Sequence, residues 1–467
     1  MNFKTIFKSL KNKNMLKRIL IVLGIIIIYR FLSQIPVPMG DPVTFQEAVT
    51  RLLSSSDLGS FINLVSGGGL ASFSIILVGL SPYITASIVM QLITKVIPRL
   101  EELHKDGESG RRKINQWTRM LTIPLAIVQS IAYIFILQKT VLAGNTAAFV
   151  EPSMYQWIIS VAAMTAGSVI LMWFGELITE QGIGNGISMV IFAGIISGMP
   201  AQVAQIGTAL FDTSAGQLEM WGWLSIPVNP TVFWILLGFG LAMLTVLYIL
   251  VKINEAQRIV TINYAKRVRG NRSYGGIKSI LPMKLITAGV IPVIFAVAFL
   301  SLPAFVGQIL KTGGGGGALA DNLINWFTAP SAQNFTGLSP AWFIYPVAYF
   351  ILVVAFTYFY TGIVFNTTEI ADNLQKQGGF IEGVRPGNST VKFLNTTMNR
   401  LNLFGAISLG LIAMLPFITD YIFIVTTGAP IGLSLSGTGL LIVVTVALEN
   451  IRQINSRALM ITYDDYK

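Results

Sequence analysis

Ten apolar stretches, each close to the length that crosses a lipid bilayer, run along most of this 467-residue chain. A helix needs about 20 mostly apolar residues to cross the hydrocarbon layer. Because unpaired backbone groups are costly in lipid, such stretches must be helical, and none shows the alternation of a membrane-barrel strand. The chain therefore predicts an all-α integral membrane protein with ten transmembrane helices, at approximately 19–36, 73–97, 117–138, 154–175, 183–200, 231–251, 285–305, 342–362, 401–419 and 432–450.

Lysine and arginine occur mainly in alternate segments between these stretches. With ten spans, 28 of the 32 basic residues fall on one face of the membrane, whereas Arg51, Lys139 and Lys311 fall on the other. Basic residues concentrate on the cytoplasmic side of membrane proteins. We therefore expect a multi-pass membrane protein with both termini in the cytoplasm. Its expected cytoplasmic parts are an N-terminal segment 1–18, the loops 252–284 and 363–400, and a tail 451–467.

The net charge of +11 has two explanations, and charge alone leaves both open. The charge can reflect topology together with attraction to anionic lipids. Alternatively, the loops 252–284 and 363–400, which are longer than topology requires, can dock an acidic or nucleic-acid partner.

Several residue types that catalysis or metal binding needs are missing from the places where they would act. The chain has no cysteine, and its only histidine, His104, lies in a charged segment. Glu176, Asp420 and Glu449 lie at span ends, and no span carries an acid at its centre, which argues against a proton or cation relay. We expect no catalytic residue, no metal site and no cofactor. Any driving force must then come from a partner.

Two other function classes remain open at this point. A secondary transporter of a small solute would need a compact polar site near the middle of the bilayer. A membrane-embedded enzyme, such as an intramembrane hydrolase, would need paired catalytic groups inside the spans.

Two segments interrupt the simple pattern of spans and loops. Residues 60–72 are apolar but too short to cross, and Gly67, Gly68 and Gly69 would break a helix. This segment predicts either a re-entrant piece buried in protein or an external surface helix. Residues 176–188 contain three glycines between the fourth and fifth spans. Because no strand precedes them and no Walker motif exists, we interpret them as a tight turn rather than a nucleotide site.

Seven sequence strings closely resemble the SecY family, whose members are channel subunits of the bacterial Sec protein translocase. The strings occur in the order of the family and cover the chain from about residue 17 to 460, and the ordered set is highly specific. They are LVSGGGLASFSIILVGLSPYITASIVMQL (64–92), GESGRRK (107–113), WFGELITEQGIGNGISMVIFAGI (173–195), INYAKR (262–267), AGVIPVIFA (288–296), FNTTEIADNL (365–374) and GVRPG (383–387).

The resemblance implies a fold and a function. The fold has two pseudo-symmetric inverted five-helix halves, 19–200 and 231–450, around an hourglass pore. A lateral gate would open between the second and third spans on one side and the seventh and eighth on the other. The function is to translocate unfolded secretory polypeptides across the plasma membrane and to release hydrophobic segments sideways into the bilayer. The implied partners are the membrane subunits SecE and SecG, the SecA ATPase, ribosomes, signal peptides and nascent polypeptides.

The resemblance also implies three sets of functional residues. A constriction ring of aliphatic side chains would comprise Leu80, Ile84, Ile187, Ile191, Ile294 and Ile442. A plug, within about 60–72, would comprise Phe61, Ile62, Asn63, Leu64, Val65, Ser66, Gly67, Gly68, Gly69 and Leu70. Docking of SecA or of ribosomal RNA phosphates would involve Arg258, Lys266, Arg267, Arg269 and Arg385. Two departures from the family pattern, Ile259 after Arg258 and Thr367 in place of a proline, concern the docking loops.

Overall fold

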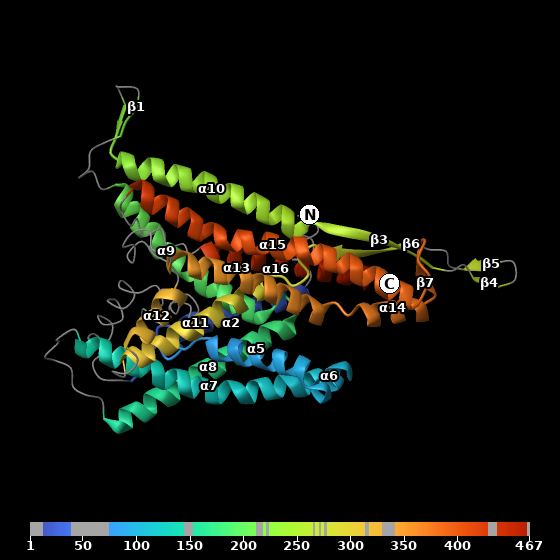
Figure 1. Ribbon diagram of the computed structural model, residues 1–467, viewed down its shortest axis with the longest axis horizontal. Helices are drawn as coiled ribbons and strands as arrows, with labels where there is room; N and C mark the ends of the chain where they lie inside the picture. Colours follow the sequence, from blue (N-terminus) through green and yellow to red (C-terminus); the bar gives the residue numbers. More distant parts are fainter. Residues whose placement is uncertain are drawn as a thin grey trace. The chain divides into compact units, whose positions relative to one another are not determined.

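A computed structural model gives the fold of most of the chain (Figure 1). It describes residues 13–38, 74–143, 153–211, 218–220, 224–264, 267–269, 272–274, 278–312, 317–328, 341–427 and 437–464.

Each of the ten predicted spans coincides with a helix. These helices are α2 (Lys13–Leu32), α5 (Ser81–Val96), α7 (Glu108–Ala143), α8 (Met154–Gln181), α9 (Gly186–Leu210), α10 (Pro230–Glu255), α11 (Ile291–Thr312), α13 (Ala341–Val364), α15 (Asn388–Thr427) and α16 (Gly437–Asp464). Three shorter helices are α6 (Pro98–Lys105), α12 (Gly317–Phe327) and α14 (Thr367–Lys376). Within the described ranges, six stretches are long and apolar enough to cross a membrane: Glu108–Ile136, Met154–Gln181, Pro230–Glu255, Ile291–Lys311, Phe343–Lys376 and Asn388–Leu415.

The second span begins later than the sequence predicts. Its apolar stretch starts near residue 73, but α5 starts only at Ser81. Gly79 has a left-handed backbone, with φ of 62°, and Pro82 occupies the first turn of α5, where its missing N–H is not needed. The residues before α5 bond instead to the end of α2 and the residues after it. Ser74 Oγ donates to the Leu32 carbonyl at 2.9 Å, and Ile75 N donates to the Ile35 carbonyl at 3.0 Å.

Helices α7 and α15 extend beyond the predicted spans because helical hydrogen bonding does not stop where apolarity ends. In α15 the thirteen polar-rich residues from Asn388 to Arg400 precede the predicted span, yet they continue the same helix. The helix begins only after Gly387, whose φ of 94° breaks the helical path. Hydropathy therefore locates the membrane-embedded part of a helix, not its ends.

The loops carry short strands that the sequence analysis did not predict. They are β1 (Leu218–Met220), β2 (Leu224–Ile226), β3 (Gln257–Tyr264), β4 (Arg267–Arg269), β5 (Arg272–Tyr274), β6 (Lys278–Lys284) and β7 (Gly379–Ile381). Strands β6, β3 and β7 form an antiparallel three-stranded sheet in that order. Loop 252–284 is thus mainly a β-hairpin, and β7 from loop 363–400 joins it.

The described residues cluster in two compact units. The first combines Met1–Phe211 with Val297–Pro346 and Thr419–Lys467, and the second combines Asp212–Ala296 with Val347–Ile418. The two inverted halves, 19–200 and 231–450, concern internal symmetry and stay a prediction.

In the first unit, α8 packs against α2, α7 and α9, while α5 packs against α7 and α8 and α16 against α9. Helices α8 and α9 approach so closely that a side chain at Gly186 would collide with the Gly175 carbonyl. The turn between them ends α8 at Gly182 and starts α9 at Gly186, whose N–H donates to Thr179 Oγ1 at 2.9 Å. The predicted tight turn at 176–188 is therefore confirmed.

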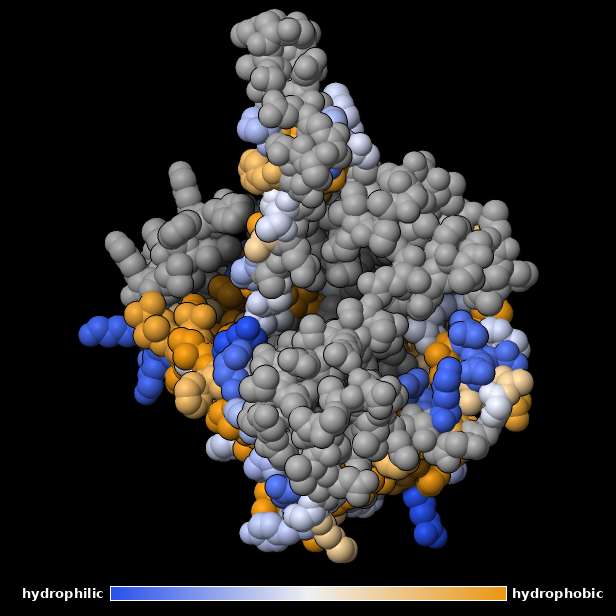
Figure 2. Space-filling model, turned by 90° about the vertical axis from the view of Figure 1, so that its left-hand side faces the viewer, coloured by the Kyte–Doolittle hydropathy of each residue, from blue (hydrophilic) through white to orange (hydrophobic). Residues whose placement is uncertain are grey.

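Large apolar side chains remain exposed on the outer faces of the helices. Ile27 of α2, for example, is 69% exposed. Figure 2 shows apolar residues reaching the surface beside hydrophilic ones. Soluble proteins rarely expose apolar surface on this scale, and a surrounding bilayer accounts for it.

Candidate functional site

Helix α5 presents the first two candidate ring residues. Leu80 is the N-cap of α5, and its carbonyl accepts a hydrogen bond from Ile84 N at 3.0 Å, so the two residues occupy one helical turn on the same face. Both side chains are buried. The α5 entry is anchored on α8, because Ser168 Oγ donates to the Gly79 carbonyl at 2.9 Å.

Helix α9 presents Ile187 and Ile191, also one turn apart. Ile191 is buried, whereas Ile187 is half-buried. Ile187 Cγ1 lies within 3.2 Å of where a side-chain carbon at Gly175 would stand, so Ile187 packs against α8. Asn185 caps the start of α9 by accepting a hydrogen bond from Ile187 N at 3.1 Å, which fixes where this face begins.

Ile442 lies on α16, which packs against α9. It shares one buried stripe with Val446 and Asn450, at intervals of four residues. Asn450, the last residue of this stripe, lies against Gly184 in the turn between α8 and α9. Its amide Nδ2 also donates a hydrogen bond to Met189 Sδ of α9 at 2.8 Å. Three ring candidates, Ile187, Ile191 and Ile442, are thus carried by two helices in contact.

Ile294 lies in the second compact unit, in the first turn of α11. It is buried. The neighbouring Phe295 makes edge-to-face contacts with Phe356 and Tyr360 of α13, with ring centroids 6.0 and 6.3 Å apart. These contacts fix the rotation of α11, and therefore the direction in which Ile294 points.

Burial separates the ring candidates from lipid-facing aliphatic residues. Five of the six are buried and Ile187 is half-buried, whereas Ile27 and many other aliphatic residues are exposed. This favours an inward position for each candidate. That the six form one closed ring stays a prediction. The plug, from Phe61 to Leu70, lies outside the described residues.

An ion pair between neighbouring spans was missed by the sequence analysis. Arg119 Nε of α7 lies 2.6 Å from Glu176 Oε1 of α8. Sequence reasoning treated Glu176 as a span-end acid and Arg119 as part of a basic flank. Both charges at the ends of adjacent spans were visible, but only the packing of α7 on α8 shows that they meet.

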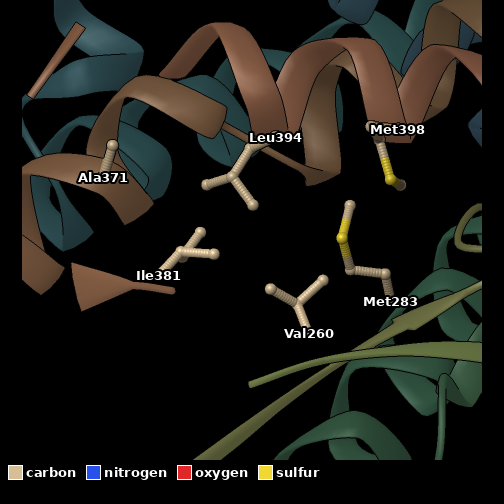
Figure 3. Packing of buried hydrophobic residues seen from close by; sticks show 6 residues of the cluster. All are labelled: Val260, Met283, Ala371, Ile381, Leu394 and Met398. Carbon is tan, nitrogen blue, oxygen red and sulfur yellow. The ribbon is translucent and has the colours of Figure 1, made fainter. Parts of the chain in front are cut away.

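The predicted docking loops form one folded platform, defined here as β3, β6, β7, α14 and the start of α15. Its core consists of Val260, Met283, Ala371, Ile381, Leu394 and Met398, which converge from the strands and from both helices (Figure 3). Two loops that lie far apart in the sequence are therefore held together by a common apolar core.

Arg385 lies in the turn between β7 and α15. Gly383 and Gly387 flank it with φ of 78° and 94°, conformations that favour glycine. The Arg385 carbonyl accepts a hydrogen bond from Thr390 Oγ1 at 3.0 Å, which holds the turn to the first turn of α15. The Arg385 side chain is exposed. Among the residues that the structure describes, it has no carboxylate within ion-pair distance.

The other docking candidates lie in the β3–β6 hairpin. Arg258 is exposed on β3, opposite Met283 in register. Arg267 and Arg269 belong to β4, which pairs with β5 at the tip, while Lys266 lies outside the described residues. Loop 252–284 contains eight basic residues and one acid, whereas 363–400 contains four basic residues and three acids. Most of the excess positive charge of the two loops thus comes from the hairpin.

The SecY family model matches residues 74–451. Proteins named protein translocase subunit SecY match almost the whole chain. The one from Streptomyces galbus is 38% identical over 464 residues, and the one from Corynebacterium glutamicum is 37% identical over 462, each covering 98% of both chains.

Solved structures share the fold. A protein-conducting channel covers 93% of this chain and 90% of its own, with a TM-score of 0.57 and 18% sequence identity. Sec61 from a canine ribosome–channel complex covers the same shares, with a TM-score of 0.51 and 17% identity. The match to the family model and to full-length relatives above 30% identity, together with this shared fold, shows that the chain belongs to the SecY family of protein translocase subunits.

Proposed function

We propose that this chain is the protein-conducting channel of a Sec translocase in a plasma membrane, with its basic loops and both termini in the cytoplasm. The observation that carries the proposal is the burial of aliphatic side chains at the ring positions of α5, α9, α11 and α16 in a chain that matches SecY subunits from end to end. The asymmetry of basic residues supports the orientation.

An aliphatic constriction suits a substrate of any sequence. Since Leu80, Ile191 and Ile442 offer no hydrogen bonds, a passing chain meets a deformable collar rather than a selective site. Without substrate, an apolar constriction stays dry and impedes ions, as hydrophobic gates do. Apolar segments prefer lipid, because Leu contributes roughly −0.5 kcal/mol and a central Arg about +3 kcal/mol to insertion. Such segments leave sideways when the gate opens, while polar stretches pass through.

Crosslinking tests the pore. A cysteine at Ile191, in a chain that has none of its own, should crosslink to a secretory precursor stalled during export. Ile196 is the matched control, because it lies on the same helix but is exposed. We expect strong crosslinking at 191 and little at 196. Equal crosslinking at both positions, or export without contact at 191, would refute the pore assignment.

The platform is proposed as the docking surface for SecA and the ribosome, with SecE and SecG as membrane partners and anionic lipids around the basic loops. Two fold relatives were solved as ribosome complexes, canine Sec61 and yeast Ssh1 bound to the 80S ribosome. The exposed Arg258 and Arg385 can neutralise phosphates without reading bases.

A further inference from the structure

Helix α12 packs against α11 near the end of α11, at Gly307. A side-chain carbon at Gly307 of α11 would lie 2.9 Å from Leu323 Cβ and 3.1 Å from Ile324 Cγ1, so α12 fits against this glycine. One turn further along α11, Lys311 Nζ pairs with Asp321 Oδ1 at 2.8 Å. The Ala320 carbonyl oxygen is equally close to the side-chain carbon at Gly307, at 3.1 Å. Gly307 therefore faces the middle of α12, from 320 to 324, and Lys311 reaches Asp321 from the adjoining turn of α11.

This contact places α12 near the end of a membrane span. The predicted span ends near residue 305, and the helical part Ile291–Lys311 contains a window apolar enough to cross a membrane. Gly307 lies between these two ends, two residues past the first and four before the second, a distance of about 3 to 6 Å at 1.5 Å per residue. Interfacial helices bury their apolar faces about 5–10 Å into the boundary between headgroups and acyl chains. The part of α12 that contacts Gly307, from 320 to 324, thus lies near this boundary.

The faces of α12 match such a location. Ala320, Leu323 and Ile324 face α11, and the exposed polar residues of α12 are Asp321, Asn322 and Asn325. Leu319 and Trp326, seven residues apart, lie on a third side and are 72% and 43% exposed. At the same level, α11 exposes Val306 and Leu310. Exposed apolar surface therefore continues from a membrane span onto α12.

We propose that α12 is an interfacial membrane anchor, with Trp326 and Leu319 in contact with the phospholipids of the leaflet at the Lys311 end of α11. Tryptophan favours this position because its ring is apolar and its N–H finds a polar partner among the headgroups. The exposed Lys311–Asp321 pair lies at the wet edge of the same boundary. Through its contacts with the lipids of this leaflet, α12 fixes the depth of the end of α11 in the membrane. The inference requires only that α11 spans the membrane.

Single-cysteine labelling tests the anchor, because the full chain contains no other cysteine. Trp326→Cys and Asn325→Cys place a nitroxide on adjacent residues that face different sides, and Leu319→Cys keeps Trp326 in place. Each variant is reconstituted in vesicles of phosphatidylethanolamine and phosphatidylglycerol. Collision with oxygen, which concentrates in lipid, is compared with collision with a water-soluble nickel chelate.

We expect the oxygen-to-nickel ratio to be several-fold higher at 326 and 319 than at 325. If the labels at all three sites collide freely with the nickel chelate, α12 is surrounded by water and the proposal is wrong. If 326 and 319 are shielded from both reagents, a protein covers the helix and the lipid assignment is equally wrong. The Leu319→Cys variant decides the question by itself if Trp326→Cys fails to fold.

Discussion

Gly184 lies so close to Asn450 that a side-chain carbon at position 184 would collide with the Asn450 amide oxygen. The contact joins the turn between α8 and α9 to α16, helices that carry Ile187, Ile191 and Ile442. Gly184 also has φ of 137°, a conformation that side chains rarely adopt.

We therefore expect Gly184→Ala to destabilise the protein by about 1–3 kcal/mol through backbone strain alone, and by more through the collision. The thermal midpoint of the detergent-solubilised protein measures the effect. Gly198→Ala is the matched control, because that glycine of α9 has open space around it. It should be neutral or stabilising by up to about 1 kcal/mol. Similar losses from both changes would contradict the prediction.

The Arg119–Glu176 pair predicts an asymmetric response to neutralisation. The Glu176 side chain is 21% exposed and that of Arg119 is 48% exposed. Arg119→Gln leaves the more buried charge unpaired, whereas Glu176→Gln leaves an arginine that can reach towards water. We expect a cost of roughly 1–3 kcal/mol for Arg119→Gln and less for Glu176→Gln. The double variant should lose less than the sum, as thermal midpoints in a double-mutant cycle would show. Strict additivity would mean that the two charges do not interact.

His104 should titrate below its ordinary pKa of 6.5. Partial burial lowers the pKa of this imidazole, Arg111 and Lys95 lower it further, and Glu101 opposes them. The folded protein then binds the proton less readily than the unfolded chain. Stability linked to His104 is therefore complete above about pH 6.5 and is lost as the pH falls from there through the folded pKa.

Because His104 is the only histidine, nitrogen-15 histidine labelling reports a single titrating imidazole in NMR, through its two ring nitrogens. Arg111→Gln should raise its pKa, whereas Lys113→Gln removes a charge that is not among those acting on His104 and should shift the pKa less. An imidazole pKa at or above 6.5 in the unmodified protein would overturn the assignment.

The platform core should decide whether the two docking loops stay together. Ile381 of β7 is buried in that core, while the adjacent Phe380 is exposed. Ile381→Ala should cost about 2–5 kcal/mol locally, and it should speed amide hydrogen exchange in β3 and β7 while leaving the spans protected. Phe380→Ala should change exchange little. Equal effects from both substitutions would argue against the core.

Charge reversal tests the docking surface. Arg385→Glu should weaken binding of SecA or of the ribosome by about tenfold, or about 1.4 kcal/mol, with the difference shrinking at high salt. Lys392→Glu makes the same charge change at an exposed residue of α15 and should act more weakly. Indistinguishable losses would show that net charge, rather than the turn at Arg385, governs docking.

Several features followed from local chemistry. The positions of the spans could be predicted because twenty apolar residues in lipid must form a helix, whatever surrounds them. The turn at 176–188 could be predicted because glycine adopts left-handed backbone conformations more readily than other residues. Gly182 and Gly184 do adopt them. All six ring candidates, Leu80 and Ile84 among them, could be named only through family resemblance, since an aliphatic residue inside a span looks the same in the sequence whether it faces lipid or protein.

Hydropathy and charge along the chain were thus enough to determine which segments enter the membrane and on which side the basic loops are expected. Tertiary structure alone decided that Arg119 meets Glu176, that Asn450 closes on Gly184, that α5 begins at Ser81, and that two distant loops share one core. The physical reason is that transfer into lipid depends on each segment by itself, whereas ion pairs and packing depend on which segments become neighbours.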